Sequence, residues 1–236
     1  LEGAFALPGF NDAHVHIDAT GALLTGANLL DVHEAEAFAE RIAAAANRLP
    51  DGSWITRGDW GAYELWAMGS AGAQEGEAQR ERFKPHRDMI DDVTPNHPVL
   101  VNRHDREVYL ANSRALELAG IDERTRSPRG GTIEKDSSGR PTGILTGSAV
   151  DLVRSVIPPL PFDTRLANFM AVLERARAVG VTTIQDLTRA PQVMVYREAQ
   201  RRGDLTCRIQ LRPMLDQVDH VAGLGISEGI GDDWIK

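Results

Sequence analysis

The chain has 236 residues, of which 42% are hydrophobic and 25% charged, which is ordinary for one large globular domain or two small ones. Its formal net charge of −8 argues against nucleic acid as a partner, and no apolar run is long enough to span a membrane. The single cysteine, Cys207, excludes an intrachain disulfide, fits a reducing, cytoplasmic compartment and is expected to pack in a buried strand.

Two histidines stand one residue apart in the segment LPGFNDAHVHI, residues 7–17. Because side chains alternate faces along a strand, His14 and His16 are predicted to point to one side and into one cavity. Two imidazoles on one face can share a divalent metal such as Zn, Fe, Ni or Mn. The alternative is a pair of solvent-facing or core histidines. Asp12 either hydrogen-bonds a ligand histidine or caps the Pro-Gly turn.

The next segments alternate between glycine-rich and helix-forming composition. Residues 19–32 are predicted to form a loop or short helix, and 34–48 a helix that ends at Pro50. A strand is expected at 54–60, followed by a surface loop at 69–76. The aromatic residues gathered here form either an apolar wall for a substrate or part of the core: Trp54, Trp60, Tyr63 and Trp66.

Residues 50–155 lack a regular alternation of helix and strand and are predicted to be an insertion that covers the site. Within it we expect a buried strand at 98–102, a helix at 113–119 and a hairpin at 131–145. Loops of this length in a compact fold are usually functional. Asn112 or Ser113 is expected to cap the helix.

From residue 162 onward helices and strands alternate regularly. The predicted order is helix 163–179, strand 181–187, helix 191–202, strand 206–215 and helix 216–224. Such alternation indicates βαβ units and a parallel sheet, in which chemistry sits at the carboxyl ends of strands. His14, His16 and Asp186 fall near such ends. Asp186 either lines the barrel mouth or caps the helix that follows.

The opening segment resembles the PGF-x-D-x-H-x-H signature of the amidohydrolase superfamily. Later segments follow in the order of its amidohydrolase 3 group, the YtcJ-like metal-dependent hydrolases, with N-substituted formamide deformylase among its members. These segments are GSWITRGDW (52–60), VTPNHPVLVNRHD (93–105), LANSRALELAGI (110–121), GGTIEKDSSGRPTGIL (130–145) and AVGVTTIQDL (178–187). The resemblance implies an α/β fold, namely a partial (β/α)8 TIM-like barrel of the metal-dependent hydrolase type with a long insertion after its first strand.

The same resemblance implies a site. His14 and His16 would bind a divalent metal, expected to be zinc, that activates water to cleave a C–N bond of a small amide, formamide or cyclic amide. The general base and the remaining ligands are expected beyond Lys236. The residues expected to contact the substrate or the metal ligands are Asp12, Trp60, Asp105, Glu107 and Asp186.

One departure from the family pattern concerns residues 105–107. Many relatives read Asp-Gly-His there, whereas this chain reads Asp105, Arg106 and Glu107. The departure puts the role of that histidine in question. It also favours the alternative function, a non-catalytic ligand- or partner-binding module with a vestigial metal site.

These inferences define three expected segments. Residues 1–49 would hold the first barrel strand and helix, 50–155 the insertion, and 156–236 further β/α units. Because the chain starts without Met and stops abruptly, we expect a piece of a longer enzyme that lacks the β-sandwich and the rest of the barrel. Such a piece is expected to be inactive alone, and its open sheet edges favour self-association.

Overall fold

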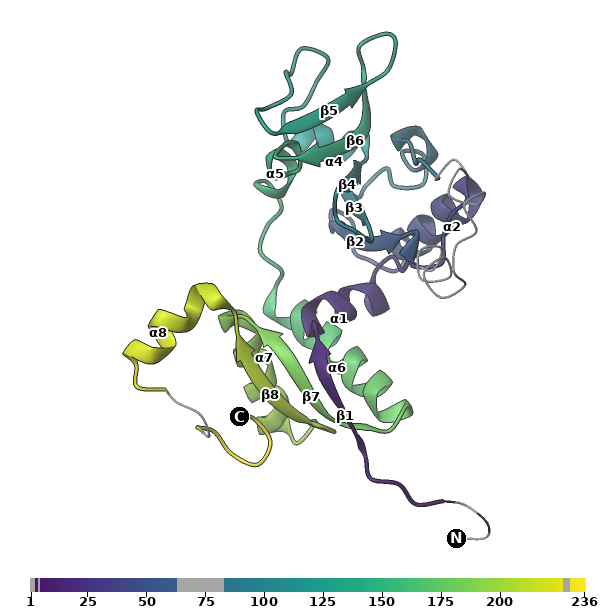
Figure 1. Ribbon diagram of the computed structural model, residues 1–236. Coiled ribbons are helices and arrows are strands. Elements are labelled where there is room, and N and C mark those ends of the chain that lie inside the picture. The colour runs from purple at the N-terminus through teal and green to yellow at the C-terminus, as the bar shows by residue number, and fades with distance from the viewer. Residues whose placement is uncertain (1–2, 4, 63–82, 227–229) are drawn as a thin grey trace, which may run out of the picture. The chain divides into compact units, whose positions relative to one another are not determined.

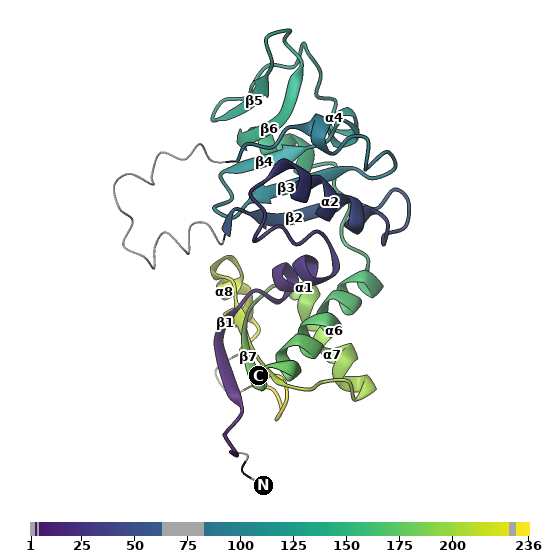
Figure 2. The same cartoon turned by 90° about the vertical axis from the view of Figure 1, so that its right-hand side faces the viewer.

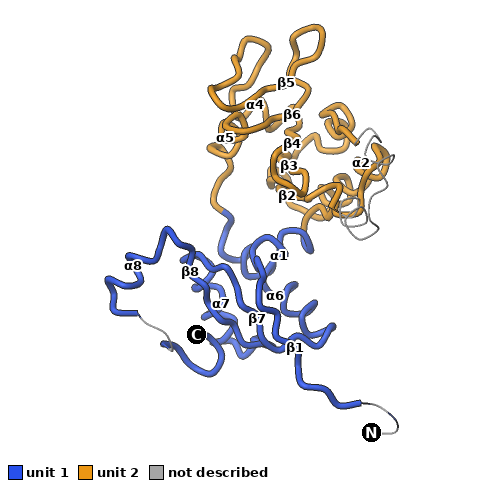
Figure 3. Tube along the Cα trace, viewed as in Figure 1, with its two compact units in different colours: residues 1–25, 160–236 blue, residues 26–159 orange. Residues whose placement is uncertain are grey.

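The computed structural model describes residues 3, 5–62, 83–226 and 230–236, and it divides into two compact units (Figure 3). Unit 1 joins residues 1–25 to residues 160–236, and unit 2 is the continuous stretch 26–159. Tyr63, Trp66 and the expected loop at 69–76 lie outside the described residues.

Unit 1 is built on a three-stranded parallel sheet (Figure 1). Its strands lie in the order β1 (Phe10–Val15), β7 (Val181–Thr188) and β8 (Arg208–Pro213). The helices are α1 (Ile17–Thr25), α6 (Phe162–Ala178), α7 (Ala190–Arg202) and α8 (Val218–Gly223), the last preceded by a 3-10 turn, Leu215–Gln217. Helices α6 and α7 lie on one face of the sheet (Figure 2). The alternation of helix and strand predicted after residue 162 is confirmed.

The core of unit 1 lies between that sheet face and the two helices. Helix α6 buries residues at a helical period, and α7 packs beside it on the same sheet face. The core includes Leu166, Phe169, Val172, Leu173, Ala176, Ile184, Val195, Tyr196, Cys207 and Ile209. Each fully buried large side chain contributes about 1.5–3 kcal/mol to folding. Cys207 is 1% exposed and packs here as predicted, and burial raises the pKa of its thiol to about 11.

Helix α1 packs closely against α6. A Cβ added to Gly21 would lie 2.8 Å from the carbonyl oxygen of Asn168, so only glycine permits this approach without a shift. Thr25 Oγ1 donates a hydrogen bond of 2.7 Å to Asn168 Oδ1. Asp18 also forms an ion pair with Arg165. The segment that follows the two histidines is therefore held along its length by α6.

Unit 2 is built on a five-stranded mixed sheet. Its order is β2 (Ile55–Trp60), β3 (Val99–Arg103), β4 (Val108–Ala111), β6 (Pro141–Gly147) and β5 (Gly131–Lys135). Strands β2 and β3 pair in parallel, and the other pairs are antiparallel. Helix α2 (Ala35–Ala46) and the short helix Arg87–Met89 pack on one face, and α4 (Ser113–Leu118) and α5 (Ala149–Arg154) on the other.

The units differ from the expected segments at α2. This helix, expected with the first barrel strand, buries Phe38, Ile42 and Ala45 against Val99 and Leu110 of the unit 2 sheet. The apolar side of α2 therefore packs on the sheet of unit 2. The sequence also missed β4 and α5, which are only 4 and 6 residues long. Short elements carry too little periodicity to be recognised.

The parallel sheet of unit 1 gains no strand from the described residues of unit 2. The parallel sheet of unit 1 has three strands among the described residues, so the fold is mixed α/β and this part of the chain forms no closed barrel. That residues 50–155 cover the site stays a prediction. Among the described residues, no helix has both the length and the apolar character needed to cross a membrane.

We expect Gly21→Ala to destabilise the protein by about 1–3 kcal/mol, because the new methyl group overlaps Asn168. The matched control is Gly223→Ala in α8, where nothing lies within 4 Å of the added Cβ. That substitution should be neutral or stabilising by up to about 1 kcal/mol. Urea unfolding measures both. Equal effects at the two positions would show that α1 and α6 do not pack as described.

Cys207 should make stability depend on pH in the alkaline range. Its pKa rises from 9.0 in the unfolded chain to about 11 in the fold. Below the lower value the thiol is protonated in both states. As pH rises further, only the unfolded thiol ionises, so stability falls by about 1.4 kcal/mol per pH unit until the folded thiol also ionises. Cys207→Ala should remove this slope while leaving a constant offset. Parallel pH profiles of the two proteins would contradict the burial of the thiol.

Candidate functional site

The imidazole rings of His14 and His16 meet at the carboxyl end of β1. Their Nε2 atoms are 3.4 Å apart, the ring centroids are 5.2 Å apart, and the ring planes cross at 70°. Both residues are exposed. His14 lies in β1, whereas His16 follows Val15, the last strand residue, and precedes α1. The two rings therefore share one side of the chain, as the period-two spacing predicts, and present two nitrogen ligands together.

A β-bulge in β1 helps to set this geometry. Asp12 pairs with Ile184 and Val15 pairs with Asp186, so three steps along β1 match two along β7. Asp12 Oδ1 accepts a hydrogen bond of 3.2 Å from the backbone amide of His14, which lies within the bulge. Bulges of this kind often lie beside active sites and redirect a side chain. Asp12 thus holds the His14 backbone, a role that neither sequence alternative anticipated.

The main chain after His16 is held by a carboxylate from the neighbouring strand. The Ile17 amide donates a hydrogen bond of 2.9 Å to Asp186 Oδ1, and the His16 carbonyl accepts one of 2.9 Å from the Thr20 amide. The first amide groups of a helix have no partner within the helix, and a negative charge at that end is stabilising. Asp186 therefore caps α1 from β7. The alternative that it caps the following helix is wrong, since Arg189 is the N-cap of α7.

Asp186 is itself enclosed, with none of its surface exposed. Its Oδ2 accepts hydrogen bonds from Tyr196 Oη at 2.7 Å, Thr188 Oγ1 at 2.9 Å and Gln192 Nε2 at 3.4 Å. Burial and the adjacent negative charge of Asp186 raise the pKa of Tyr196, so its hydroxyl stays protonated and donates. Sequence reasoning missed these three supporting residues. The available signal was Gln192 and Tyr196 standing four residues apart on the helix face directed at the sheet.

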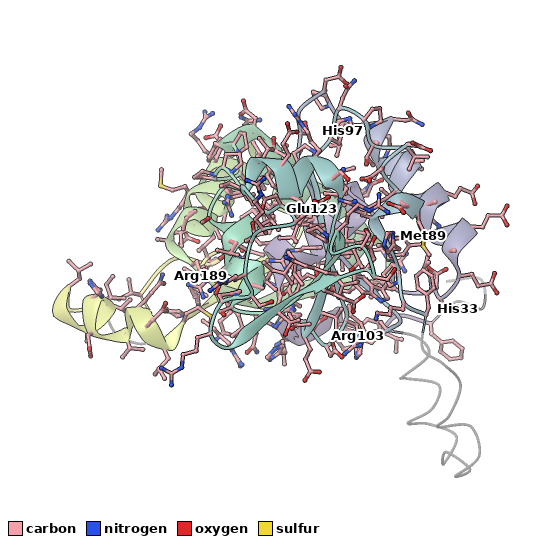
Figure 4. The ribbon with its side chains drawn as sticks, turned by 90° about the horizontal axis from the view of Figure 1, so that it is seen from above. His33, Met89, His97, Arg103, Glu123 and Arg189 are labelled. Carbon is pink, nitrogen blue, oxygen red and sulfur yellow. The ribbon has the colours of Figure 1, made fainter. Side chains whose placement is uncertain are left out.

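The predicted contacts Asp105 and Glu107 form a local ion-pair group around Arg103, labelled in Figure 4. Arg103 Nη2 lies 2.6 Å from Asp105 Oδ2 and 3.5 Å from Glu107 Oε2, and the Glu107 amide donates to Asp105 Oδ1 at 3.0 Å. Desolvation works to raise the pKa of Asp105, but the hydrogen bonds from Arg103 and the Glu107 amide outweigh it, so the pKa lies below its usual value. These contacts stabilise the turn between β3 and β4.

Arg106 sits at the tip of that turn in the left-handed region, with φ of 61°. Its amide donates to the Arg103 carbonyl at 2.8 Å, which closes the turn. Glycine adopts this conformation without steric cost, whereas other residues strain there. A glycine at this position, which the family resemblance implies, would adopt the turn without the strain that this chain carries at Arg106.

Of the aromatic residues near β2, the two that the structure describes, Trp54 and Trp60, pack on opposite faces of the unit 2 sheet. Trp60 is 2% exposed and packs edge to face on Phe38, with ring centroids 5.8 Å apart, whereas Trp54 packs partly buried in the cluster on the opposite sheet face. For these two the core-packing alternative holds. The residues leading into Trp60 are strained, since Arg57 and Asp59 have φ of 70° and 53°. Such strain tends to occur at functional sites.

The expected helix cap is confirmed at Asn112. Its Oδ1 accepts hydrogen bonds of 2.9 Å from the amides of Ala115 and Val99, which ties the start of α4 to β3. Ser113 instead donates from its hydroxyl to Asp91 at 2.6 Å. The role of this motif is therefore structural.

The predicted site residues separate into two groups. His14, His16, Asp12 and Asp186 lie together on β1 and β7 of unit 1, whereas Trp60, Asp105 and Glu107 belong to unit 2. Within the described ranges, no cluster of three or more His, Cys, Asp or Glu side chains is arranged to hold a metal ion. The chain therefore presents a pair of imidazole ligands supported by two carboxylates that are engaged with the backbone.

Fold and site together define a class: a mixed α/β protein with a His-x-His pair at the carboxyl end of the first strand of a parallel sheet. The whole chain, residues 1–236, matches the model of the amidohydrolase family. The chain belongs to this family.

Three relatives illustrate the match. Protein LONG AFTER FAR-RED 3 of Arabidopsis thaliana is 34% identical over 80% of this chain and 30% of its own length. Putative amidohydrolase YtcJ of Bacillus subtilis (strain 168) is 30% identical over 68% and 28%, and N-substituted formamide deformylase of Arthrobacter pascens is 27% identical over 98% and 41%. The chain thus spans less than half the length of each of these relatives.

The fold is also found in solved structures. An uncharacterized metal-dependent hydrolase from Pyrococcus horikoshii OT3 superposes with a TM-score of 0.62 over 97% of this chain and 41% of that chain, at 18% identity. Another from Pyrococcus furiosus gives 0.62 over 97% and 42%, at 20% identity. At these identities the similarity concerns the fold alone.

We expect Arg106→Gly to stabilise the protein by about 0.5–1 kcal/mol, because relief of left-handed strain exceeds the added flexibility of the unfolded chain. The matched control is Arg126→Gly, an exposed loop position without positive φ, which should lose up to about 1 kcal/mol. Thermal unfolding of the three proteins decides the sign. Destabilisation at both positions would mean that Arg106 is not strained.

Proposed function

We propose that the protein containing this chain is a metal-dependent hydrolase that cleaves the C–N bond of a small amide, formamide or cyclic amide. His14 and His16 would hold a divalent metal, with zinc as the preferred ion. The observation that carries the proposal is the 3.4 Å separation of their Nε2 atoms. Two nitrogen ligands at the usual zinc distance in a tetrahedral site are about 3.3 Å apart, so the observed separation matches that of two ligands on one metal.

The donor set fits as well as the spacing. Neutral imidazoles are common zinc ligands, and both rings are exposed at the end of a parallel strand, where small molecules bind in this class of fold. Two ligands are half of a tetrahedral set. The remaining ligands and the general base are proposed to come from other parts of the protein, since this chain spans 28–41% of its relatives. We propose likewise that the three-stranded sheet of unit 1 is part of a (β/α)8 barrel.

This chain would contribute orientation to the reaction. The bulge and Asp12 hold the His14 backbone, and Asp186 holds the backbone that follows His16, so both imidazoles are placed before a metal arrives. A divalent metal, when bound, lowers the pKa of water toward neutrality and polarises the carbonyl group.

The choice of a C–N bond as the bond that is cleaved rests on the names of the relatives and of the family. The Arthrobacter pascens relative, matched over 98% of this chain, is by name an N-substituted formamide deformylase, and loss of a formyl group from nitrogen breaks a C–N bond. The family name itself denotes hydrolysis of amides. We therefore place N-formyl and N-acyl amines first among candidate substrates.

Removing either histidine should remove the metal and the activity. In the intact gene product, His14→Ala and His16→Ala are each expected to lower zinc affinity and turnover of N-formyl amines by about 100-fold or more. Loss of a residue that only hydrogen-bonds a metal ligand typically costs about 10- to 100-fold, and loss of the ligand itself should cost more. Dialysed protein would be analysed by atomic emission and assayed against a panel of N-formyl and N-acyl amines.

The matched control is His33→Ala, since His33 is exposed beside α2 (Figure 4) and lies outside the pair. It should retain metal and rate. Full metal content in His14→Ala would place the site elsewhere. A wild-type protein that holds no stoichiometric metal after dialysis would favour the rival hypothesis of a vestigial site in a binding module.

A further inference from the structure

The Asp186 carboxylate raises a physical question. It is completely buried, and among the described residues it forms hydrogen bonds but no ion pair. Burying a carboxylate is costly unless its oxygens are fully bonded. Here the hydrogen bonds come from neutral groups, three from side chains of β7 and α7 and one from the backbone after His16. An asparagine or an apolar residue would cost less to bury in a purely structural position, so the presence of a carboxyl group here calls for another explanation.

The explanation lies in the peptide that joins His16 to Ile17. Its carbonyl oxygen accepts from the Thr20 amide at 2.9 Å, and its N–H donates to Asp186 at 2.9 Å. Both polar atoms of one peptide plane are therefore held, one by α1 and one by β7. The orientation of this plane limits the backbone rotation of His16 and with it the direction of its Cβ. That direction determines whether the imidazole meets His14.

The other side of the carboxylate is anchored equally firmly. Thr188, Gln192 and Tyr196 all donate to Oδ2, which leaves Oδ1 directed at Ile17. Hydrogen bonds to an ionised acceptor are shorter and stronger than neutral ones. Asp186 is thus a rigid link between helix α7 and the backbone beside the histidine pair.

We infer that Asp186 is the positioning residue of this site, which aims the His14–His16 pair by fixing the His16–Ile17 peptide. The inference rests on the proposed function in that the pair is taken to hold a metal. It goes further in assigning the geometry of the pair to a buried carboxylate that acts through the backbone beside His16.

The test is Asp186→Asn in the intact gene product. Asparagine keeps the size, but its NH2 group must face either the Ile17 amide or the donors on Oδ2, so one contact is lost. We expect exchange of the Ile17 amide with solvent to accelerate at least about tenfold, and zinc affinity, measured by chelator competition, to fall about 10- to 100-fold. In crystals of the metal-free variant the Nε2 atoms should separate by about 1 Å or more.

The control for lost stability is Val195→Ala, which removes core packing on α7 and leaves the hydrogen-bond donors to Asp186 in place. It should lower the unfolding midpoint as Asp186→Asn does while zinc affinity stays within about threefold. If Asp186→Asn keeps wild-type zinc affinity, or loses no more of it than Val195→Ala at equal loss of stability, the inference is overturned.

Two further arms keep the outcomes distinct. If wild-type protein binds no zinc, the proposed function fails, and the metal-free crystals alone decide the inference: an unchanged separation in Asp186→Asn overturns it, and a widened pair supports it. If Asp186→Asn does not fold, Thr188→Val replaces it, removing one donor to Oδ2 with a side chain of the same shape. A loss of zinc affinity of about three- to tenfold supports the inference, and no loss overturns it.

Discussion

The hydrogen bond from the Ile17 amide to Asp186 is the constraint on which unit 1 depends. Its partners are separated by 169 positions in the chain, and it joins the start of α1 to the buried face of β7. Hydrogen bonds to a charged acceptor contribute about 1.5–3 kcal/mol, and this one also caps a helix. The same bond lies one residue beyond His16. Stability of the fold and geometry of the site are thus joined in a single interaction.

The pairing of β1 with β7 explains why unit 1 is discontinuous. The chain leaves after α1, forms the whole of unit 2 and returns through α6. Unit 2 has cores on both faces of its own sheet and needs no strand from unit 1 among the described residues. The loop after β3 shows the same self-sufficiency, because the ion pairs of Arg103 support the turn that holds Arg106 in the left-handed region.

Two buried residues, Asp186 and Trp60, have surroundings that the sequence did not reveal. Asp186 was expected at the mouth of a barrel or at a helix cap, and it lies in the interior between two helices and a strand. Trp60 was a candidate wall of a substrate pocket, and it packs on Phe38. In both cases the residue type was compatible with a site, and the neighbours that decided its role come from distant parts of the chain.

The sequence by itself determined the elements after residue 162, helix α2, the hairpin of β5 and β6, the cap at Asn112 and the adjacency of the two imidazoles. These features depend on local periodicity and on contacts between residues a few positions apart, which a single sequence displays. The tertiary structure alone decided that α2 belongs to unit 2, that His14 lies within a bulge and that Asp186 holds Ile17. Each of these depends on contacts between residues far apart in the chain, and the local spacing of residues does not indicate such contacts.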